Sequence, residues 1–254
     1  MDIEKIKNEF IRISKLGYLE NIVSENNDGA AGNTFEHHLG VIENNLKEPD
    51  YEGFEVKTKK WYSGKSSTPF SLFTLRPTSP NNGDGYMREN WGIYDKRYPT
   101  IKRFSTSIYA NKWSKVYKKN LLRLEVNKID KKLYMLYADL NENVLDKTIY
   151  WSFDDIEVGA NKLKNMFLVN ANVKTENNKN YFHYTDATIL MDYLGHFKFI
   201  ELLQEGLIRY DNRLGVYGPK TKNPGTPHNH GGGFRIDKKN IDKLFNTRID
   251  VSVS

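Results

Sequence analysis

The amino-acid sequence predicts a mixed α/β protein in which a central sheet is flanked by helices. Two spacing patterns support this prediction. Residues 2–16 carry apolar side chains at steps of three and four positions, which indicates an amphipathic helix that ends at Gly17. Apolar and polar residues instead alternate in segments 121–127 and 132–138, which indicates two strands joined as an antiparallel hairpin. Both kinds of element therefore occur in one chain, which has no repeat at a fixed period.

The composition is that of a folded protein with a basic surface. The chain has 254 residues, of which 38% are hydrophobic and 13% aromatic, enough for one large domain or two closely packed lobes. It contains no cysteine, which excludes disulfides and thiolate metal sites. The formal net charge of +6 favours a polyanionic partner. The sequence has no signal peptide and no long apolar run, so we expect a cytoplasmic protein without a membrane partner.

Other elements are expected from the same patterns. A second helix should follow the polar stretch 24–32, with Asn33 as its N-cap and an apolar face formed by Phe35, Leu39, Ile42 and Leu46. Further along the chain we expect a strand at 70–75 beside the one at 53–58, and a loop at 77–85. The hairpin of 121–127 and 132–138, together with 144–153, should extend the central sheet. The remaining expected elements are a helix at 154–164, a hairpin formed by 167–173 and 181–184, a helix at 188–204 and a strand at 207–217.

The stretch from 48 to 57 places charged side chains in a short strand pattern. Apolar and charged residues alternate here, so Glu55 and Lys57 point to one face of the strand. Asp50 lies upstream of Gly53, which permits a sharp bend, and can bring a second carboxylate to the same place. Two carboxylates hold a hard cation such as Mg²⁺, and a lysine positions the attacking water or polarises the phosphate. The stretch therefore predicts a metal-dependent phosphodiesterase centre.

A surface ion pair on an edge strand is the alternative explanation for Glu55 and Lys57. The same spacing of an acidic residue and a lysine recurs at 130–132 and 237–239, in charged surroundings typical of a solvated surface. Only the triplet at 55–57 lies within a strand pattern. The pattern by itself leaves both explanations open.

Glu36 also has two explanations. It follows Asn33 by three residues, which is the spacing of a capping box whose carboxylate accepts a hydrogen bond from a backbone N–H. The functional explanation is that this helix delivers a further carboxylate to the site of Asp50 and Glu55.

The stretch from 228 to 235 is the second informative motif. In an extended segment His228 and His230 project from one face and Asn229 from the other. The stretch can be a flexible polar loop, a metal site that needs at least one further ligand, or a loop that reads bases. A base-reading loop suits the residue types best, because histidine, asparagine and Arg235 present donors and acceptors that fit purine edges in the major groove.

Several short motifs together resemble one enzyme family. They are Gly32-Asn33-Thr34-Phe35-Glu36, Pro49-Asp50, Glu55-Val56-Lys57-Thr58, Ser71-Leu72-Phe73-Thr74, Met87-Arg88, Leu122-Arg123-Leu124-Glu125-Val126, Tyr150-Trp151-Ser152-Phe153, Arg213-Leu214-Gly215-Val216-Tyr217 and His228-Asn229-His230-Gly231. Their order and spacing resemble the MvaI/BcnI-like type II restriction endonucleases, which are relatives of the mismatch-repair nickase MutH and have the PD-(D/E)xK nuclease fold. The resemblance spans most of the chain.

The resemblance implies a role for each residue of the centre. Asp50 and Glu55 would bind the metal together with the backbone carbonyl of Val56, Lys57 would orient the attacking water, and Glu36 would assist directly or through a water molecule. The implied cofactor is Mg²⁺, with Mn²⁺ as a substitute and Ca²⁺ as an ion that binds without supporting cleavage.

The resemblance also implies a restriction-endonuclease-like architecture of two lobes around a basic, DNA-binding cleft. Residues 1–160 would form mainly the catalytic lobe and residues 161–254 mainly the DNA-recognition lobe. The residues expected to bind DNA are Arg88, Arg213, Tyr217, Lys220, Lys222, His228, His230 and Arg235.

The expected activity is sequence-specific cleavage of double-stranded DNA. The resemblance implies a monomer that nicks the two strands in turn at a short, C/G-rich, pseudo-symmetric site, and a companion DNA methyltransferase that protects host DNA. One alternative is a MutH-like repair enzyme that nicks a single strand. A second, from another functional class, is a catalytically silent DNA-binding module.

Overall fold

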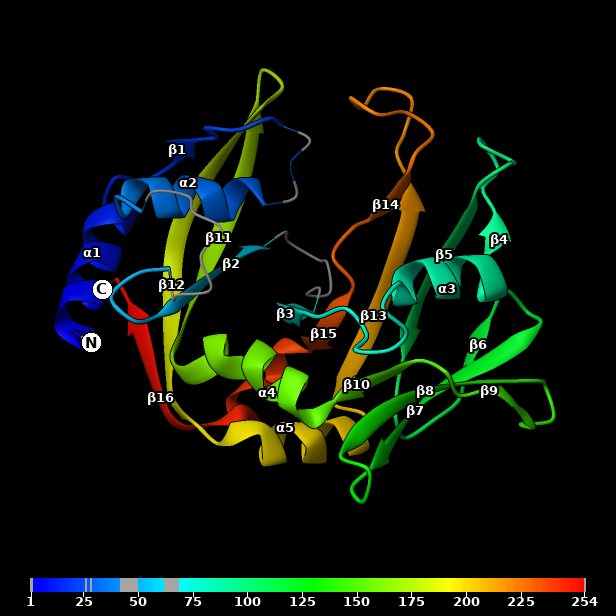
Figure 1. Cartoon of the computed structure of the whole chain (residues 1–254). Helices are drawn as coiled ribbons and strands as arrows, with labels where there is room; N and C mark the ends of the chain where they lie inside the picture. The colour runs from blue at the N-terminus through cyan, green and yellow to red at the C-terminus, as the bar shows by residue number, and fades with distance from the viewer. Residues whose placement is uncertain (1, 26, 28, 42–49, 62–68, 254) are drawn as a thin grey trace. The chain divides into compact units, whose positions relative to one another are not determined.

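The computed structural model describes residues 2–25, 27, 29–41, 50–61 and 69–253 (Figure 1). The chain forms two compact units, each built from separated segments. Unit 1 comprises residues 1–68, 162–194 and 241–254, and unit 2 comprises residues 69–161 and 195–240. The lobes expected at 1–160 and 161–254 are therefore each divided between the two units. The physical reason is strand pairing, since a strand from the second half of the chain completes the sheet that the first half begins.

Unit 1 contains a five-stranded mixed sheet. Its strand order is β1 (Leu19–Glu20), β12 (Lys179–Tyr193), β11 (Met166–Glu176) and β2 (Glu55–Trp61), and β16 (Phe245–Ser252) also pairs with β12. β2 and β11 are parallel, with Val56 opposite Phe167, whereas the other pairs are antiparallel. The expected hairpin of β11 and β12 and the expected mixed sheet are thus confirmed.

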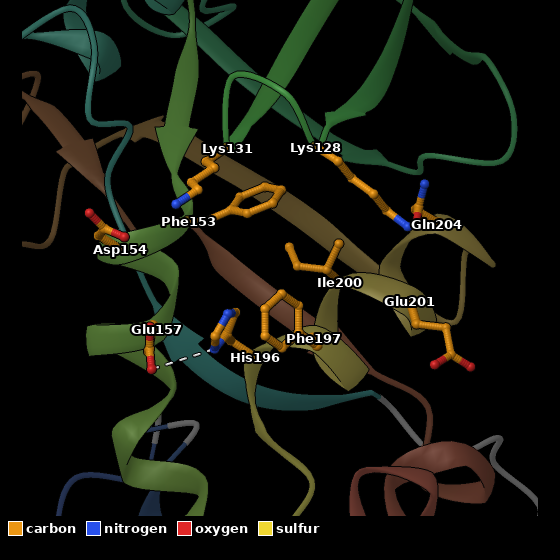
Figure 2. A pocket seen from close by; sticks show the side chains of 10 residues that line it. All are labelled: Lys128, Lys131, Phe153, Asp154, Glu157, His196, Phe197, Ile200, Glu201 and Gln204. Atoms are coloured by element: carbon orange, nitrogen blue, oxygen red, sulfur yellow. Dashed lines mark ion pairs between the residues drawn. The ribbon is translucent and has the colours of Figure 1, made fainter.

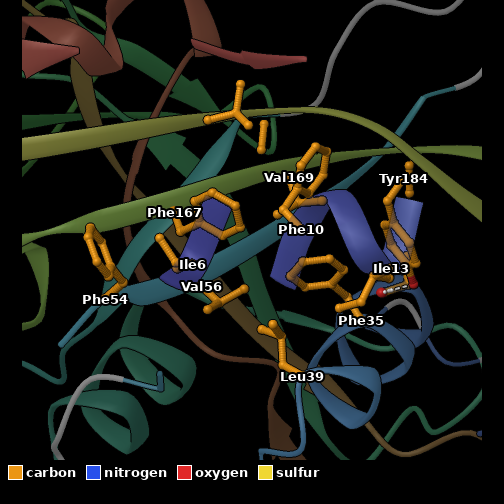
Figure 3. Packing of buried hydrophobic residues seen from close by; sticks show 14 of the residues in the cluster. Ile6, Phe10, Ile13, Phe35, Leu39, Phe54, Val56, Phe167, Val169 and Tyr184 are labelled. Carbon is orange, nitrogen blue, oxygen red and sulfur yellow. Dashed lines mark hydrogen bonds between the residues drawn. The ribbon is translucent and has the colours of Figure 1, made fainter. Parts of the chain in front are cut away.

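Two helices cover the apolar face of this sheet (Figure 3). The helix α1 (Ile3–Ser14) begins at Asp2, whose carboxylate accepts a 2.9 Å hydrogen bond from the N–H of Lys5. The chain turns after it at Gly17, where φ is +76°. The side chains buried between the helices and the sheet are Ile6, Phe10, Ile13, Phe35, Leu39, Phe54, Val56, Phe167, Val169 and Tyr184.

The second helix, α2 (Ala30–His38), begins earlier than the sequence pattern predicts. Its N-cap is Gly29, so Asn33 lies inside the helix and the capping-box explanation of Glu36 is wrong. The cause is the pair Ala30 and Ala31, which are strong helix formers and are buried in the core of unit 1. The predicted face positions 42 and 46 lie outside the described residues.

Unit 2 contains a six-stranded antiparallel sheet. One of its faces is apolar and packs Phe104, Tyr210 and Phe234 into the core, together with Trp151 and Phe199 from other elements. The strand order is β3 (Phe70–Thr74), β15 (Gly233–Ile236), β13 (Ile208–Val216), β5 (Lys102–Ile108) and β4 (Ile93–Tyr94), and β14 (Pro227–Asn229) also pairs with β13.

A second sheet of unit 2 has the order β10 (Tyr150–Ser152), β8 (Lys132–Ala138), β7 (Asn120–Asn127) and β6 (Ser114–Val116), with β9 (Val144–Asp146) also paired to β8. The predicted β7–β8 hairpin is confirmed. Two predictions of strand partners are wrong. The hairpin and the stretch 144–153 form this separate sheet instead of extending the sheet of β2, and β3 pairs with β15 instead of β2. Phe73 of β3 packs against Phe234 of β15, and Trp151 of β10 contacts the same ring.

The helices of unit 2 include one that the sequence did not predict. The helix α3 (Gly83–Trp91) replaces the end of the expected loop 77–85, and the side chain of Asn82 caps it by accepting a hydrogen bond from the N–H of Gly85. The helix α4 (Phe153–Ala160) and a 3₁₀ turn (Asn161–Lys164) agree with the prediction. The expected helix at 188–204 is wrong in its first third. β12 continues to Tyr193 because β16 pairs with it, and α5 spans Gly195–Gln204.

A second 3₁₀ segment, Lys238–Leu244, leads into β16. Among the described helices, none has the length and apolar character needed to cross a membrane.

Candidate active site and nucleic-acid interface

The first carboxylate of the candidate active site opens β2. Glu55 is only 3% exposed, and its N–H donates a 2.9 Å hydrogen bond to the carbonyl of Asn165. Its Oε1 accepts from the Lys57 ammonium at 2.5 Å. Its Oε2 is buried without a hydrogen-bond partner among the described residues. Burial of a carboxylate oxygen without a hydrogen-bond donor costs free energy, so a bound cation or a donor would stabilise this oxygen.

A tight turn brings the second carboxylate to the same strand end. Tyr51 and Phe54 exchange backbone hydrogen bonds of 3.0 and 2.7 Å across a turn in which Gly53 has φ of +84°. The turn directs the chain back, so that Asp50 Oδ2 accepts a 2.9 Å hydrogen bond from the N–H of Val56. The bend expected at Gly53 is confirmed, and its left-handed backbone conformation favours glycine.

The donor set suits a hard divalent cation. Asp50 and Glu55 offer carboxylate oxygens, and Lys57 bonds one oxygen of Glu55 while the other remains without a partner. Within the described ranges, no group of three or more histidine, aspartate or glutamate side chains has metal-ligand spacing. Two protein carboxylates are a common ligand set for Mg²⁺, which keeps water or substrate oxygens as its other ligands. The residues present therefore fit such an ion.

Glu36 lies on α2, which approaches β2 closely. A Cβ atom added to Gly32 would lie 3.7 Å from Glu36 Oε1 and 3.9 Å from the Cβ atom of Thr58. Burial raises the pKa of Tyr184, and the negative charge of Glu36 raises it further. The carboxylate of Glu36 therefore lies near the Thr58 and Tyr184 side of the sheet. It does not join Asp50 and Glu55 in a three-carboxylate group, and its catalytic role stays a prediction.

In unit 2, one face of the six-stranded sheet is polar. Arg209, Asp211 and Arg213 alternate along β13, and Arg235 on β15 pairs with Arg209 across the strands. Asp211 receives ion pairs from Arg209 Nε at 3.1 Å and Arg235 Nε at 3.0 Å, and a 2.6 Å hydrogen bond from the Ser107 hydroxyl. Burial lowers the pKa of Arg235, against the opposing effect of Asp211. Asp211 thus holds two guanidinium groups in defined positions.

Asp211 and Arg209 are residues that sequence reasoning did not single out. The signal was present as the alternation of Arg209, Asp211 and Arg213 within a strand pattern, since alternate residues share a face. Of the residues predicted to bind DNA, Arg213 is exposed on this face. Lys220 and Lys222 are exposed in the segment between β13 and β14.

An aromatic cluster formed by Tyr217, His228 and His230 adjoins this face. The rings of Tyr217 and His228 stack with centroids 4.0 Å apart, and His230 meets His228 edge-on at 4.1 Å. A Cβ atom added to Gly215 would lie 2.7 Å from His230 Nε2, so the absence of a side chain at Gly215 makes room for this ring. The structure therefore brings together three of the residues predicted to bind DNA.

Arg88 is the predicted DNA-binding residue whose surroundings differ most from the expectation. It lies on α3 and is only 7% exposed. Its guanidinium donates to the carbonyls of Gly215 at 2.7 Å, Lys102 at 2.9 Å and His228 at 3.3 Å. Burial lowers the pKa of Arg88, and the negative charges of Asp84 and Glu89 oppose this shift. The guanidinium thus faces backbone oxygens instead of solvent.

A pocket of about 680 Å³ lies elsewhere in unit 2, between α4, α5 and the β7–β8 turn (Figure 2). An ion pair of 3.4 Å between His196 and Glu157 borders it, beside the ring of Phe197, which is 77% exposed. The pocket contains none of the predicted catalytic or DNA-binding residues.

Comparison with known proteins agrees with the family that the motifs suggested. The sequence pattern of the MvaI/BcnI restriction endonuclease family matches residues 7–245. A structure of the restriction endonuclease MvaI with its cognate DNA substrate is similar with a TM-score of 0.87 and 25% identity over 99% of both chains. A structure of MvaI without DNA has a TM-score of 0.58 and 23% identity, over 99% of this chain and 98% of that one.

No curated protein sequence matches the chain significantly. The expected fold is nevertheless confirmed, and the family pattern extends over nearly the whole sequence. The protein therefore belongs to the MvaI/BcnI restriction endonuclease family.

Proposed function

We propose that this type II restriction endonuclease hydrolyses DNA with Mg²⁺ held by Asp50 and Glu55. The observation that carries the proposal is the buried Oε2 of Glu55, which has no hydrogen-bond partner among the described side chains and backbone groups. Asp50 accepts a hydrogen bond from the next residue of the strand, Val56. When bound, the cation would lower the pKa of a water molecule and stabilise charge on the phosphate. The Val56 carbonyl completes the proposed ligand set.

Lys57 is proposed to orient the attacking water. Its ammonium bonds Glu55 Oε1 and its side chain is 29% exposed, so it is both fixed at one end of the site and open to solvent. An ammonium at this position can donate a second hydrogen bond to water or to a phosphate oxygen. Glu36 is proposed to assist from α2, either through a water molecule or after adjustment on DNA.

The polar face of unit 2 is proposed to read the bases of double-stranded DNA. Arg235 and the exposed Arg213 supply guanidinium donors suited to guanine, which is the commonest specific contact in the major groove. His228, His230 and Tyr217 add donors, acceptors and ring surfaces. Lys220 and Lys222 would contact phosphates, which adds affinity without sequence information.

Guanidinium donors on the proposed reading face favour a C/G-rich target. We also propose that the protein acts as a monomer that nicks both strands in turn at a pseudo-symmetric site. A companion DNA methyltransferase would protect host DNA. Mn²⁺ is expected to replace Mg²⁺, and Ca²⁺ to support binding without cleavage.

The test is digestion of a sequenced, unmethylated plasmid by the purified protein, with Mg²⁺ and with EDTA. We expect linear product with uniform fragment ends in Mg²⁺ and none in EDTA. Nicked circles that never become linear would instead favour a MutH-like nickase. Specific retention of duplex DNA without any Mg²⁺-dependent cleavage would mean a silent DNA-binding module and would refute the proposal.

A further inference from the structure

The helix α3 contacts the segment that carries His228 and His230 through two of its residues. Asp84 and Arg88 are four positions apart on α3 and so lie on one side of the helix. Asp84 Oδ2 accepts a 2.7 Å hydrogen bond from the amide Nδ2 of Asn229, and Arg88 donates to the carbonyl of His228. One helix face therefore contacts two successive residues of the segment.

Both ends of the Asn229 side-chain amide form hydrogen bonds. Its Oδ1 accepts hydrogen bonds from the N–H groups of Gly231 at 2.9 Å and Gly232 at 2.8 Å. Asp84, when ionised, only accepts hydrogen bonds, so the Nδ2 end of the amide must face Asp84 and the Oδ1 end must face the glycines. The orientation of Asn229, and with it the path of the backbone that follows, is thus set from α3.

Arg88 fixes the other side of the same segment. By donating to Gly215 and His228 it joins β13 to β14 at the position where these two residues are paired. The histidine rings project from this backbone, His228 against Tyr217 and His230 over Gly215. A shift of the backbone would therefore move both imidazoles.

We infer that Asp84 and Arg88 are positioning residues for sequence recognition, which act through Asn229 and the β14 backbone and do not touch DNA themselves. This inference rests on the proposed base-reading role of His228 and His230. It assigns Arg88 a different role from the direct DNA contact that the sequence suggested. Donors and acceptors discriminate between bases only while they are held in fixed positions. The contacts of Asp84 with Asn229 and of Arg88 with the His228 carbonyl hold the backbone that carries the two histidines.

The first experiment exchanges the two partners of the Asp84–Asn229 contact. Asn229→Asp places two carboxylates against each other, and we expect discrimination between the target and a target with one base pair changed to fall by about 10-fold. The double variant Asp84→Asn with Asn229→Asp restores a donor and an acceptor with the same total charge, and should recover most of the discrimination. Binding is measured in Ca²⁺ at pH 8.

Asp84→Asn alone is the intermediate case, because an amide oxygen can still accept from Asn229 but the amide no longer fixes which end of Asn229 faces it, and we expect a smaller loss of discrimination than for Asn229→Asp. It also removes the 3.4 Å ion pair of Asp84 with Arg76, which is 81% exposed and so contributes little. If the exchanged variant discriminates as poorly as Asn229→Asp, Asn229 itself contacts the bases and the inference is wrong. If Asn229→Asp lowers the melting temperature but leaves discrimination intact, the contact is only structural and the inference is also wrong.

The second experiment uses Arg88→Lys, which keeps the positive charge but cannot form the fork of hydrogen bonds. We expect lower discrimination with an unchanged dependence of affinity on salt. Loss of a phosphate contact would instead reduce the slope of log K against log salt by about 1 and weaken all duplexes alike. A reduced slope would overturn the inference for Arg88. If the wild-type protein shows no preference for any duplex, the proposed function fails, and not this inference alone.

Discussion

The carboxylate of Asp50 accepts a hydrogen bond from the backbone N–H of Val56, with 2.9 Å between Oδ2 and the amide nitrogen. The backbone hydrogen bonds between Tyr51 and Phe54 close the turn at Gly53. The contact with Val56 then holds Asp50 beside the first residues of β2, where Glu55 has a buried oxygen without a partner in the described structure. Asp50 therefore has a structural role in addition to the metal-binding role proposed for it.

We expect Asp50→Ala and Lys57→Ala to abolish cleavage while leaving target binding largely intact, because both residues are proposed to act on metal and water and not on bases. Cleavage is measured on plasmid in Mg²⁺, and binding in Ca²⁺. Asp130→Ala and Lys132→Ala are matched controls, since they remove the same pair of residue types from a triplet in unit 2 and should cleave normally. Cleavage at the wild-type rate by the Asp50→Ala variant would show that the catalytic centre lies elsewhere.

Glu36→Gln should have a milder effect than either of these changes. Glu36 lies on α2 near Thr58, and the structure does not group it with the two carboxylates at the end of β2. Residues that support metal ligands indirectly typically contribute about 10- to 100-fold in activity. Single-turnover cleavage rates in Mg²⁺ measure this effect. A complete loss of cleavage would instead mean that Glu36 binds the metal directly on DNA.

Arg235→Ala and His230→Ala should weaken binding to the target much more than binding to random duplex. Each lost base contact typically costs about 1–3 kcal/mol of discrimination at one position. Lys220→Ala and Lys222→Ala are the controls, because a lost phosphate contact weakens both duplexes nearly equally and reduces the salt dependence. Competition binding in Ca²⁺ distinguishes these results. Equal losses on both duplexes for Arg235→Ala and His230→Ala would mean that another surface reads the sequence.

Gly215→Ala should also reduce discrimination, although it removes no functional group. The added methyl would lie 2.7 Å from Nε2 of His230, closer than carbon and nitrogen can approach, so the ring must move. Gly218→Ala is the matched control, since its methyl meets only the Arg97 guanidinium at 3.7 Å. Relative cleavage of the target and of single-base variants is the measurement. Unchanged relative rates for Gly215→Ala would argue against any role of the His230 ring in recognition.

Local features of the active centre could be predicted from the sequence because their causes are close together in the chain. The alternation at 55–57 is a property of consecutive residues in any strand, and the bend before it needs only Gly53. The β7–β8 and β11–β12 hairpins were predicted for the same reason, as each joins neighbouring segments through a short turn. The order and spacing of the family motifs predicted the fold and the activity in addition.

Pairings between distant segments could not be predicted from periodicity. The parallel partner of β2 is β11, more than a hundred residues later, and β3 pairs with β15 across a still longer separation. Apolar strands carry no local mark of their partners, and the choice depends on which faces pack together. This is also why residues 188–193 continue β12 instead of starting a helix, since β16 pairs with them.

The sequence alone determined which residue types are available for chemistry: Asp50, Glu55 and Lys57 at one strand end, and two histidines beside a glycine run. Only the tertiary structure decided which charged groups are buried and what they contact. It gave Asp211 two guanidinium partners, left Glu55 Oε2 without one among the described residues, and turned Arg88 towards backbone carbonyls. The physical reason is that burial and hydrogen-bond geometry depend on segments that meet only when the chain is folded.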